Sequence, residues 1–418
     1  GAISAVALRV LAFSCVRVPP LFLARSLTTN EIGDEGAEYL ASGLEKNGAL
    51  TTLDLTDNEI GAEGTERLSS ALKKNRTLTT LNLDSNGIGK GVEYLASSLE
   101  ENWTLTTLNL NGIEIGDKGA RHLAPALKKN TTLSTLGLND TEMGAEGALH
   151  LASALEKNRT LTTLDLSVNV VGDEGVQHLA SALKINMALT TLNLSANEIC
   201  DDGAKLLATA LQTNDTLMTL DLSLNEMGAK GALHLASALE KNRKLMTLDL
   251  SAIRICVQGA RHLSRALETN TALTTLDLSQ KTMGTRGAQH LVSALMRNRK
   301  LMTLNLSQNA TAMRVKGTMY LALALEENRA LTTLDLSQNK IGDKGAKYLA
   351  SALEKNGTLT ELDLSQNKIG DKGAEYLALA LKMNGTLTAI DLTTNEIGDQ
   401  GAEYLASALK KNRALRTL

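Results

Sequence analysis

The sequence has little of the material from which most globular cores are built. Aromatic residues make up only 2% of its 418 residues, so large rings cannot fill the core. Leucine and alanine must do so, which suits thin layers that are stacked many times. The formal net charge is −3, which gives the whole chain no general attraction to nucleic acid or to an anionic membrane. We therefore expect neither as a partner.

Cysteine is also scarce, with only Cys15, Cys200 and Cys256 in the chain. The last two are 56 residues apart and occupy the same position of a sequence repeat. This spacing places them two layers apart, beyond the reach of a disulfide bond. Free thiols are typical of a reducing compartment, so we expect a cytoplasmic protein.

Long apolar runs are missing from the N-terminal segment as well. The first 21 residues have no acidic residue, and their longest uncharged run is eight residues, too short to cross a bilayer. The interpretations that stay open are a degenerate end of the repeat array, a fragment boundary, or a degenerate targeting peptide. We expect a non-repeat or degenerate segment at 1–21 and a single repeat domain at 22–418.

What the chain does contain is one unit, written many times. LTTLDLSQNKIGDKGAKYLASALEKNGT at 331–358 is followed at once by LTELDLSQNKIGDKGAEYLALALKMNGT. With a weaker unit at 22–49, there are about 14 units of 28 residues, of which one is a residue shorter and one is two residues longer. The other units open at Leu50, Leu78, Leu105, Leu133, Leu161, Leu189, Leu217, Leu245, Leu273, Leu301, Leu331, Leu359 and Leu387.

Each unit changes its hydrophobic period once. Leu334 and Leu336 alternate with Asp335, which is the pattern of a short strand with leucine on one face and aspartate on the other. Ala346, Leu349, Ala350 and Leu353 then recur with the spacing of one helical face. A helix between successive strands makes those strands parallel. Strands pack about 4.8 Å apart and helices about 8–10 Å apart, so each unit is a wedge and the array must curve.

The pattern L-x-x-L-x-L-x-x-N-x-I, followed by the helix signature GA-x-x-LA-x-AL, resembles the leucine-rich repeat. The unit length resembles the ribonuclease-inhibitor subclass. The N-x-x-L joints are most similar to the C-terminal repeat arrays of NOD-like receptors of the caspase-recruitment class. This resemblance implies an α/β solenoid shaped like a horseshoe, with parallel strands on the concave face and helices on the convex face. It also implies an intracellular protein that recognises other proteins. The 418 residues contain no nucleotide-binding domain and few cysteines, so neither specific activity carries over.

Two asparagine positions recur along the array. An asparagine at the strand exit, such as Asn367, is expected to form an interior ladder that satisfies buried backbone groups. This ladder is broken at Ile113, Thr141, Ile253 and Lys281. A second asparagine, such as Asn356, stands at the end of each helix. Asparagine tolerates the left-handed conformation in which many helices end, so we expect that conformation here.

The six histidines occupy a single helix position, one per unit, and do not predict a metal site. Helices about 8–10 Å apart cannot bring two of these rings onto one zinc ion, whose bonds are near 2 Å. We expect no cofactor and no metal. The histidines are His122, His150, His178, His234, His262 and His290.

The outward strand position forms a largely acidic row along the expected concave face. No lysine or arginine occupies it in thirteen units. Such a row could attract a basic partner. It could also be only the usual strand sequence of this subclass, and both interpretations stay open. Paired carboxylates also fit acid–base catalysis, but an open strip offers no pocket that excludes water, so we expect no enzyme. The acidic candidates for partner binding are Asp221, Asp249, Asp277, Asp335, Asp363 and Asp391.

Positive charge is concentrated in one window, residues 241–320, which holds thirteen lysines and arginines against three acidic residues. Three methionines lie on the expected inner face in or just before this window, Met218, Met246 and Met302. The repeat pattern is interrupted in this window. The cause is either random drift of the sequence or a role of this window in selecting the partner. We expect the arginines to engage an acidic protein surface, with the methionines as adaptable apolar contacts. Nucleic acid is disfavoured because no aromatic residues are interleaved with the bases. The arginine candidates are Arg254, Arg261, Arg286, Arg297, Arg299 and Arg314.

The sequence as a whole favours an intracellular protein-interaction scaffold without catalytic activity. Two alternatives stay open, a regulator of a GTPase by analogy with the Ran GTPase-activating proteins, and a ligand-sensing fragment of a larger NOD-like receptor. Two local expectations follow as well. Pro125 lies inside an expected helix and predicts a kink or a late helix start. The last helix, around Leu405 and Leu409, has no complete unit after it, which predicts an exposed apolar face, fraying and self-association.

Overall fold

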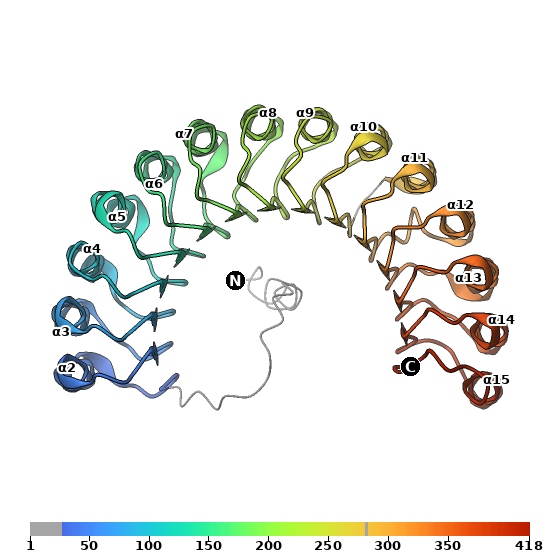
Figure 1. Cartoon of the computed structure of the whole chain (residues 1–418), viewed down its shortest axis with the longest axis horizontal. Coiled ribbons are helices and arrows are strands. Elements are labelled where there is room, and N and C mark those ends of the chain that lie inside the picture. The colour runs from blue at the N-terminus through green and yellow to red at the C-terminus, as the bar shows by residue number, and fades with distance from the viewer. Residues whose placement is uncertain (1–26, 281–282) are drawn as a thin grey trace.

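A computed structural model describes residues 27–280 and 283–418. Their strands form one parallel sheet of thirteen strands in strict sequence order, β1 to β13, and each strand pairs with the strands before and after it. Figure 1 shows the strands side by side along the inner curve of an open arc and the helices along its outer curve. The predicted α/β solenoid, with parallel strands inside and helices outside, is confirmed.

All thirteen strands are three residues long and start at equivalent positions of successive units. They are β1 (Thr52–Asp54), β2 (Thr80–Asn82), β3 (Thr107–Asn109), β4 (Thr135–Gly137), β5 (Thr163–Asp165), β6 (Thr191–Asn193), β7 (Thr219–Asp221), β8 (Thr247–Asp249), β9 (Thr275–Asp277), β10 (Thr303–Asn305), β11 (Thr333–Asp335), β12 (Glu361–Asp363) and β13 (Ala389–Asp391).

The described helices alternate with these strands, and one short 3-10 turn, η2 (Gly89–Gly91), precedes α4. The helices are α2 (Gly33–Lys46), α3 (Ala62–Lys74), α4 (Val92–Leu99), α5 (Gly116–Lys129), α6 (Ala145–Leu155), α7 (Gly172–Leu183), α8 (Asp201–Leu211), α9 (Ala229–Leu239), α10 (Val257–Thr269), α11 (Gly284–Arg297), α12 (Val315–Glu327), α13 (Gly342–Lys355), α14 (Asp371–Met383) and α15 (Asp399–Leu409).

The core is one continuous layer between the sheet and the helices. Leu334 and Leu336 of the strand motif are buried, and so are Ala346, Leu349 and Leu353 on the inner face of α13. Both periods read from the sequence therefore point to the same interior. The glycine at the start of each helix fits this close packing, because a Cβ on Gly345 would collide with the side chain of Ile341. The helices are wider than the strands, which gives the arc of Figure 1 its curvature.

The strand-exit asparagines form the predicted ladder. Oδ1 of Asn367 accepts hydrogen bonds from the backbone NH groups of Asn339 and Ile341, at 2.9 and 3.3 Å. Its Nδ2 donates to the carbonyls of Leu336 and Ser365, at 2.8 and 3.1 Å. One side chain thus satisfies groups of its own turn and of the preceding unit, which would otherwise be buried without partners.

The ladder is interrupted at the predicted positions that the structure describes. Ile113 and Ile253 are buried apolar side chains, and Thr141 is buried and donates through Oγ1 to the carbonyl of Leu138 at 3.0 Å. The predicted break at Lys281, the segment 1–21 and Cys15 lie outside the described residues.

The expectation for the helix-end asparagines was wrong in its mechanism. Asn356 has φ −77° and ψ 124°, which is extended rather than left-handed backbone. Its Nδ2 donates to the carbonyl of Leu325 in the preceding unit, at 2.7 Å. Its Oδ1 accepts from the NH groups of Thr358 and Leu359, at 3.0 and 2.8 Å. The side chain ties the joint together, so this position is a second ladder rather than a conformational helix stop.

Pro125 does not delay its helix. The helix α5 begins at Gly116 and continues through Pro125 to Lys129, so the late start was wrong. Proline removes one backbone donor, and here it does so on the exposed outer side of the helix. A kink at this residue stays a prediction.

The C-terminal end exposes part of the apolar helix face, as predicted. Leu409 of α15 is 45% exposed, whereas the equivalent Leu353 of α13 is 1% exposed. Thr417 already forms a parallel bridge with Ala389, the first contact of a further strand. Fraying and self-association through this end stay predictions.

Candidate functional site

The strands β7 to β10 place a set of acidic side chains next to one another on the concave face. Leu220, Leu248 and Leu276 point into the core and are buried, so the residues that follow them point outward. In the register of the sheet, Asp221 pairs with Asp249, and Asp249 pairs with Asp277. The next residue along this row is Asn305, whose Nδ2 donates to Oδ2 of Asp277 at 2.7 Å. We call Asp221, Asp249 and Asp277 the carboxylate row.

Asp249, the middle residue of this row, has a strongly raised pKa. Burial and, after it, the negative charges of Asp221 and Asp277 raise the pKa of Asp249 to about 7. The backbone NH of Ser251 opposes this by donating to Oδ1 of Asp249 at 2.7 Å. Burial also raises the pKa of Asp221. A positive group brought to this row would favour the ionised carboxylates, because an opposite charge favours the charged form.

A row of methionines runs along the same strands, just before each strand begins. Met218, Met246 and Met302 are 43%, 44% and 48% exposed. Their backbones continue the parallel ladder, since the NH of Met246 donates to the carbonyl of Met218 at 2.8 Å. Thr274 fills the unit between Met246 and Met302 in the same ladder. We call the three side chains the methionine row. It offers unbranched, adaptable apolar surface beside the carboxylates.

The six arginines predicted from the sequence do not form one patch with these methionines. Arg254 lies in the loop after β8, Arg314 directly precedes α12, and Arg261, Arg286 and Arg297 lie on the outer helices α10 and α11. All six side chains are exposed.

Two of these arginines already have partners within the chain. Nη1 of Arg297 forms an ion pair with Glu268 at 2.9 Å, and Nη1 of Arg299 donates to the carbonyl of Glu327 at 3.1 Å. Arg299 alone stands at a joint that leads into the methionine row, three residues before Met302.

The remaining acidic candidates continue along the strands toward the C-terminus. Asp335 pairs with Asp363, and Asp363 with Asp391, in the register of β11 to β13. Burial raises the pKa of Asp335, and Asp391 is exposed at the end of the sheet. No exposed methionine accompanies these three residues on their strands.

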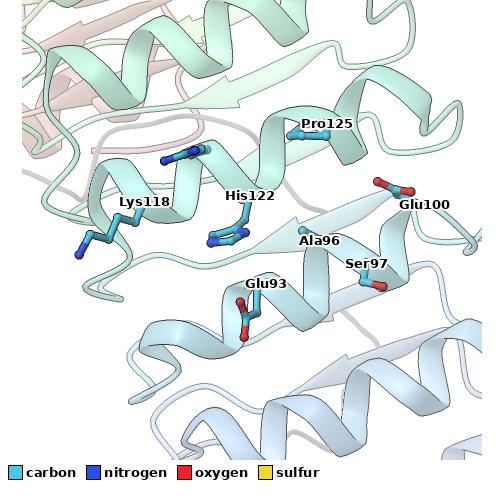
Figure 2. Close-up of a pocket in the computed structure, with 8 residues that line it drawn as sticks. Glu93, Ala96, Ser97, Glu100, Lys118, His122 and Pro125 are labelled. Carbon is cyan, nitrogen blue, oxygen red and sulfur yellow. The ribbon is translucent and has the colours of Figure 1, made fainter.

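Sequence reasoning missed a hollow on the outer side of the arc, between α4 and α5. Figure 2 shows Glu93 on α4 and Glu100 directly after it on one side of the hollow, and Lys118, His122 and Pro125 of α5 on the other. Its volume is about 520 Å³. The signal was the unit that is one residue short, where α4 spans only Val92–Leu99. The hollow carries charges of both signs, and its Glu100 is already paired with Lys129 at 2.6 Å.

Within residues 27–280 and 283–418, no three histidine, cysteine, aspartate or glutamate side chains are grouped so that they could share a metal ion. Cys200 and Cys256 are free thiols.

The sequence matches one protein family repeatedly, the family described as Leucine Rich repeat. The ten matched segments together cover more than half of the chain. The chain belongs to the leucine-rich-repeat family. The matched residues are 26–41, 47–69, 74–96, 101–124, 157–180, 186–208, 213–236, 327–350, 355–378 and 384–406.

Three solved structures are similar to this chain at low sequence identity. A chain in the crystal structure of the Rad7 and Elc1 complex in yeast is 18% identical, with a TM-score of 0.53, over 92% of this chain and 88% of that one. An internalin (inlF) from Listeria monocytogenes is 19% identical, with a TM-score of 0.46, over 91% and 82%. Actin-binding site 2 of leiomodin-1 is 22% identical, with a TM-score of 0.31, over 36% and 87%. Curated proteins gave no match.

The leucine-rich-repeat matches stop at residue 236 and resume at residue 327. Strands β8 to β10 lie between these limits and still pair in register with their neighbours. The fold of the array therefore continues through the longest stretch between matched segments. None of the helices described is both long and apolar enough to cross a membrane.

Proposed function

We propose that this leucine-rich-repeat protein is an interaction scaffold without catalytic activity of its own, and that its protein partner binds the concave face of β7 to β10. The observation that carries this proposal is the coincidence of exposed methionines with closely spaced carboxylates on four adjacent strands. Exposed apolar side chains beside polar groups are typical of protein interaction surfaces.

The partner contacts this face mainly through a positive and an apolar group. The carboxylate row holds its charges under mutual repulsion, so a lysine or arginine of the partner relieves that repulsion on binding. The methionine row adapts to the partner's apolar side chains because methionine has three rotatable bonds. The free thiols of Cys200 and Cys256 support a reducing compartment such as the cytoplasm.

Unit length and joint sequence support a place in the ribonuclease-inhibitor subclass, near the arrays of NOD-like receptors. The two alternative functions read from the sequence, GTPase regulation and ligand sensing within an immune receptor, gain no support from the residues of the concave face. Protein recognition needs only the surface that the scaffold presents.

Photo-crosslinking in cells tests the proposal directly. A photoreactive benzoylphenylalanine replaces Met246 on the concave face, and in a matched control it replaces Gln289, which is exposed on the outer helix α11. We expect crosslinks to a specific protein from position 246 and none to the same protein from position 289. Equal crosslinking from both positions, or crosslinking from position 289 alone, would contradict binding on the concave face.

A second comparison separates the concave face from the arginines of the outer side and joints. One variant changes Arg297, Arg299 and Arg314 to glutamate, a second changes Asp335, Asp363 and Asp391 to asparagine, and a third changes Met218, Met246 and Met302 to serine. We expect the methionine variant to weaken binding of the crosslinked partner most. A dominant effect of the arginine variant would move the main anchor to the arginines, toward an acidic partner surface.

A further inference from the structure

The methionine row does not stand alone, because a pair of basic joints precedes it. The sequence NRKLMTL occurs twice, at 242–248 and 298–304. In the remaining units that open at a leucine between Leu50 and Leu387, the lysine position of this motif holds threonine or alanine. We call Arg243, Lys244, Arg299 and Lys300 the basic rim.

The basic rim is held in place by its own joints. Oδ1 of Asn242 accepts from the NH groups of Lys244 and Leu245, at 2.8 and 2.7 Å. Oδ1 of Asn298 does the same for Lys300 and Leu301, again at 2.8 and 2.7 Å. The backbone under each basic pair is thus fixed, while the four side chains are exposed. Among the described residues, neither Lys244 nor Lys300 forms an ion pair, so both charges face solvent.

Following one strand, the surface therefore changes character in a fixed order. Along the segment that leads into β8, it runs from the cationic Lys244, through the apolar Met246, to the carboxyl of Asp249 at the end of the strand. Five residues separate the lysine from the aspartate, which is about 15 Å of nearly extended chain. Two units further on, Lys300 and Met302 repeat the order up to Asn305, which is hydrogen-bonded to Asp277. The gradient thus occurs along β8 and along β10, which lie on either side of β9.

We propose that this gradient docks one helix of the partner protein, which lies along the strands with its charges segregated. Its acidic end lies over the basic rim, its apolar face over Met246 and Met302, and its basic end over Asp249 and Asp277. This inference rests on the proposed concave-face function and specifies the partner's chemistry.

A helix suits this face better than an added strand. β8, β9 and β10 are each paired on both sides, so their backbones offer no free edge to a partner strand. Only side chains are available, and a helix presents side chains along one face. The concave sheet curves across the strands (Figure 1), so a rod that lies along them rests in the hollow of the arc. A span of about 15 Å corresponds to about ten helical residues between the acidic and the basic end.

A selection from a peptide library tests the order of charges without knowledge of the partner. The probe is a display library of helical peptides with a constant leucine stripe, in which the other surface positions vary among glutamate, lysine and glutamine. The full chain is the bait. We expect enriched peptides to carry glutamates at one end and lysines at the other, about ten residues apart. Enriched peptides without charge segregation, or no enrichment at all, would overturn the proposal.

Two charge-matched variants make the test specific for the rim. Lys244→Glu with Lys300→Glu reverses two charges of the basic rim, whereas Lys205→Glu with Lys230→Glu reverses two exposed charges on the outer helices α8 and α9. For a charge-segregated peptide, fluorescence anisotropy should show a loss of affinity of about tenfold with the rim variant and almost none with the outer variant. A peptide of the same composition with mixed charges should not distinguish the two variants. Equal losses in both variants would show bulk electrostatics and overturn the proposal.

The outcome is separable from that of the proposed function. If position 246 crosslinks to the partner but the enriched peptides show no charge segregation, binding on the concave face is supported and the proposed charge-segregated helix is refuted. Absence of partner crosslinks from position 246 would remove the proposed function itself.

Discussion

The units that contain α13 and α15 have nearly the same sequence and different surroundings. GAKYLASALEKN at 345–356 and GAEYLASALKKN at 401–412 differ at two positions. Leu349 and Leu353 are fully buried in the first, while Leu405 is 8% and Leu409 45% exposed in the second. The next unit, with α14, covers the first, whereas the structure describes only residues 413–418 beyond the second. In this array, burial is a property of neighbours rather than of the unit itself.

The same comparison applies to the concave face. Asp249 and Asp391 both follow a core residue of a strand, at equivalent positions. Asp249 lies between Asp221 and Asp277 and is half-buried, with its pKa raised to about 7, whereas Asp391 is exposed on the last strand. Identical motifs therefore acquire different chemistry according to their place in the stack.

The largest expected difference between the middle and the end concerns core leucines. Leu353→Ala should destabilise the protein by about 2–5 kcal/mol, because it leaves a cavity among packed units. Leu409→Ala should cost less than about 1 kcal/mol, because solvent already reaches that side chain. Denaturant unfolding followed by circular dichroism, with hydrogen exchange of α13 and α15, measures both. Equal losses would show that the last helix is as well covered as the interior helices.

The strand-exit ladder should give the next largest difference. Asn367→Ala removes the partner of four buried backbone groups and should cost about 2 kcal/mol. Asn395→Ala, at the half-buried last rung, should cost less because water can replace its bonds. Hydrogen exchange should accelerate at the amides of Asn339 and Ile341 in the first variant, and at those of Asn367 and Ile369 in the second. Gln366→Ala is the control, since that side chain is exposed. Unchanged protection of the Ile341 amide from hydrogen exchange in Asn367→Ala would show that the ladder does not stabilise this turn.

The carboxylate row should give a pH-dependent difference. The folded-state pKa of Asp249, about 7, lies above the ordinary value of 3.8, so the fold disfavours the ionised form. The penalty is present in full above pH 7 and disappears as the pH falls toward 3.8. Asp249→Asn should therefore stabilise the protein by about 1 kcal/mol at pH 8 and progressively less on acidification.

Asparagine fits this site, because Oδ1 of Asn193 and of Asn305 accept the same backbone bond at equivalent positions, at 3.0 and 2.9 Å. Asp391→Asn, on the exposed last strand, provides the comparison and should change stability less. Stability gained by Asp249→Asn equally at pH 4 and pH 8 would refute the linkage.

The smallest differences are expected on the outer helices. Arg297→Ala breaks the ion pair with Glu268, and Lys74→Ala breaks the 2.8 Å pair with Glu45 nearer the N-terminal end. Each should change the free energy of unfolding by less than about 1 kcal/mol, because exposed ion pairs are weak. Thermal unfolding at low and high salt measures both. A large loss for Arg297 alone would show that position in the array matters for surface pairs as well.

Much of the fold could be predicted because the same strand and helix pattern recurs in every unit of the repeat. The change of period between Leu336 and Ala346 identifies strand and helix, and the helix between successive strands makes those strands parallel. The strand-exit ladder followed from the need to satisfy buried amides. The helix-end ladder at Asn356 could not be read in this way. Asparagine suits both a left-handed cap and an inter-unit bridge, and only the position of the Leu325 carbonyl decides between them.

The candidate site was predictable in its residue types and less so in its arrangement. Met246 and Asp249 could be placed on the inner face from strand alternation alone. Arg261 and Arg286 were counted in the same charged window, yet they lie on outer helices, because one window of sequence contributes to every side of each unit. Lys244 was one of thirteen bases in the sequence, and the structure shows that the Asn242 joint fixes its backbone just before β8.

The sequence by itself determined the unit, its two periods and the direction in which the units stack, because those depend on local spacing repeated along the chain. Only the tertiary structure decided which residues at equivalent repeat positions differ in their pKa or in their exposure to solvent. The pKa of Asp249 depends on the carboxylates of the two neighbouring strands, and the exposure of Leu409 depends on how much of a further unit covers it. Both are contacts between residues far apart in sequence, and the motif that each residue belongs to is the same everywhere.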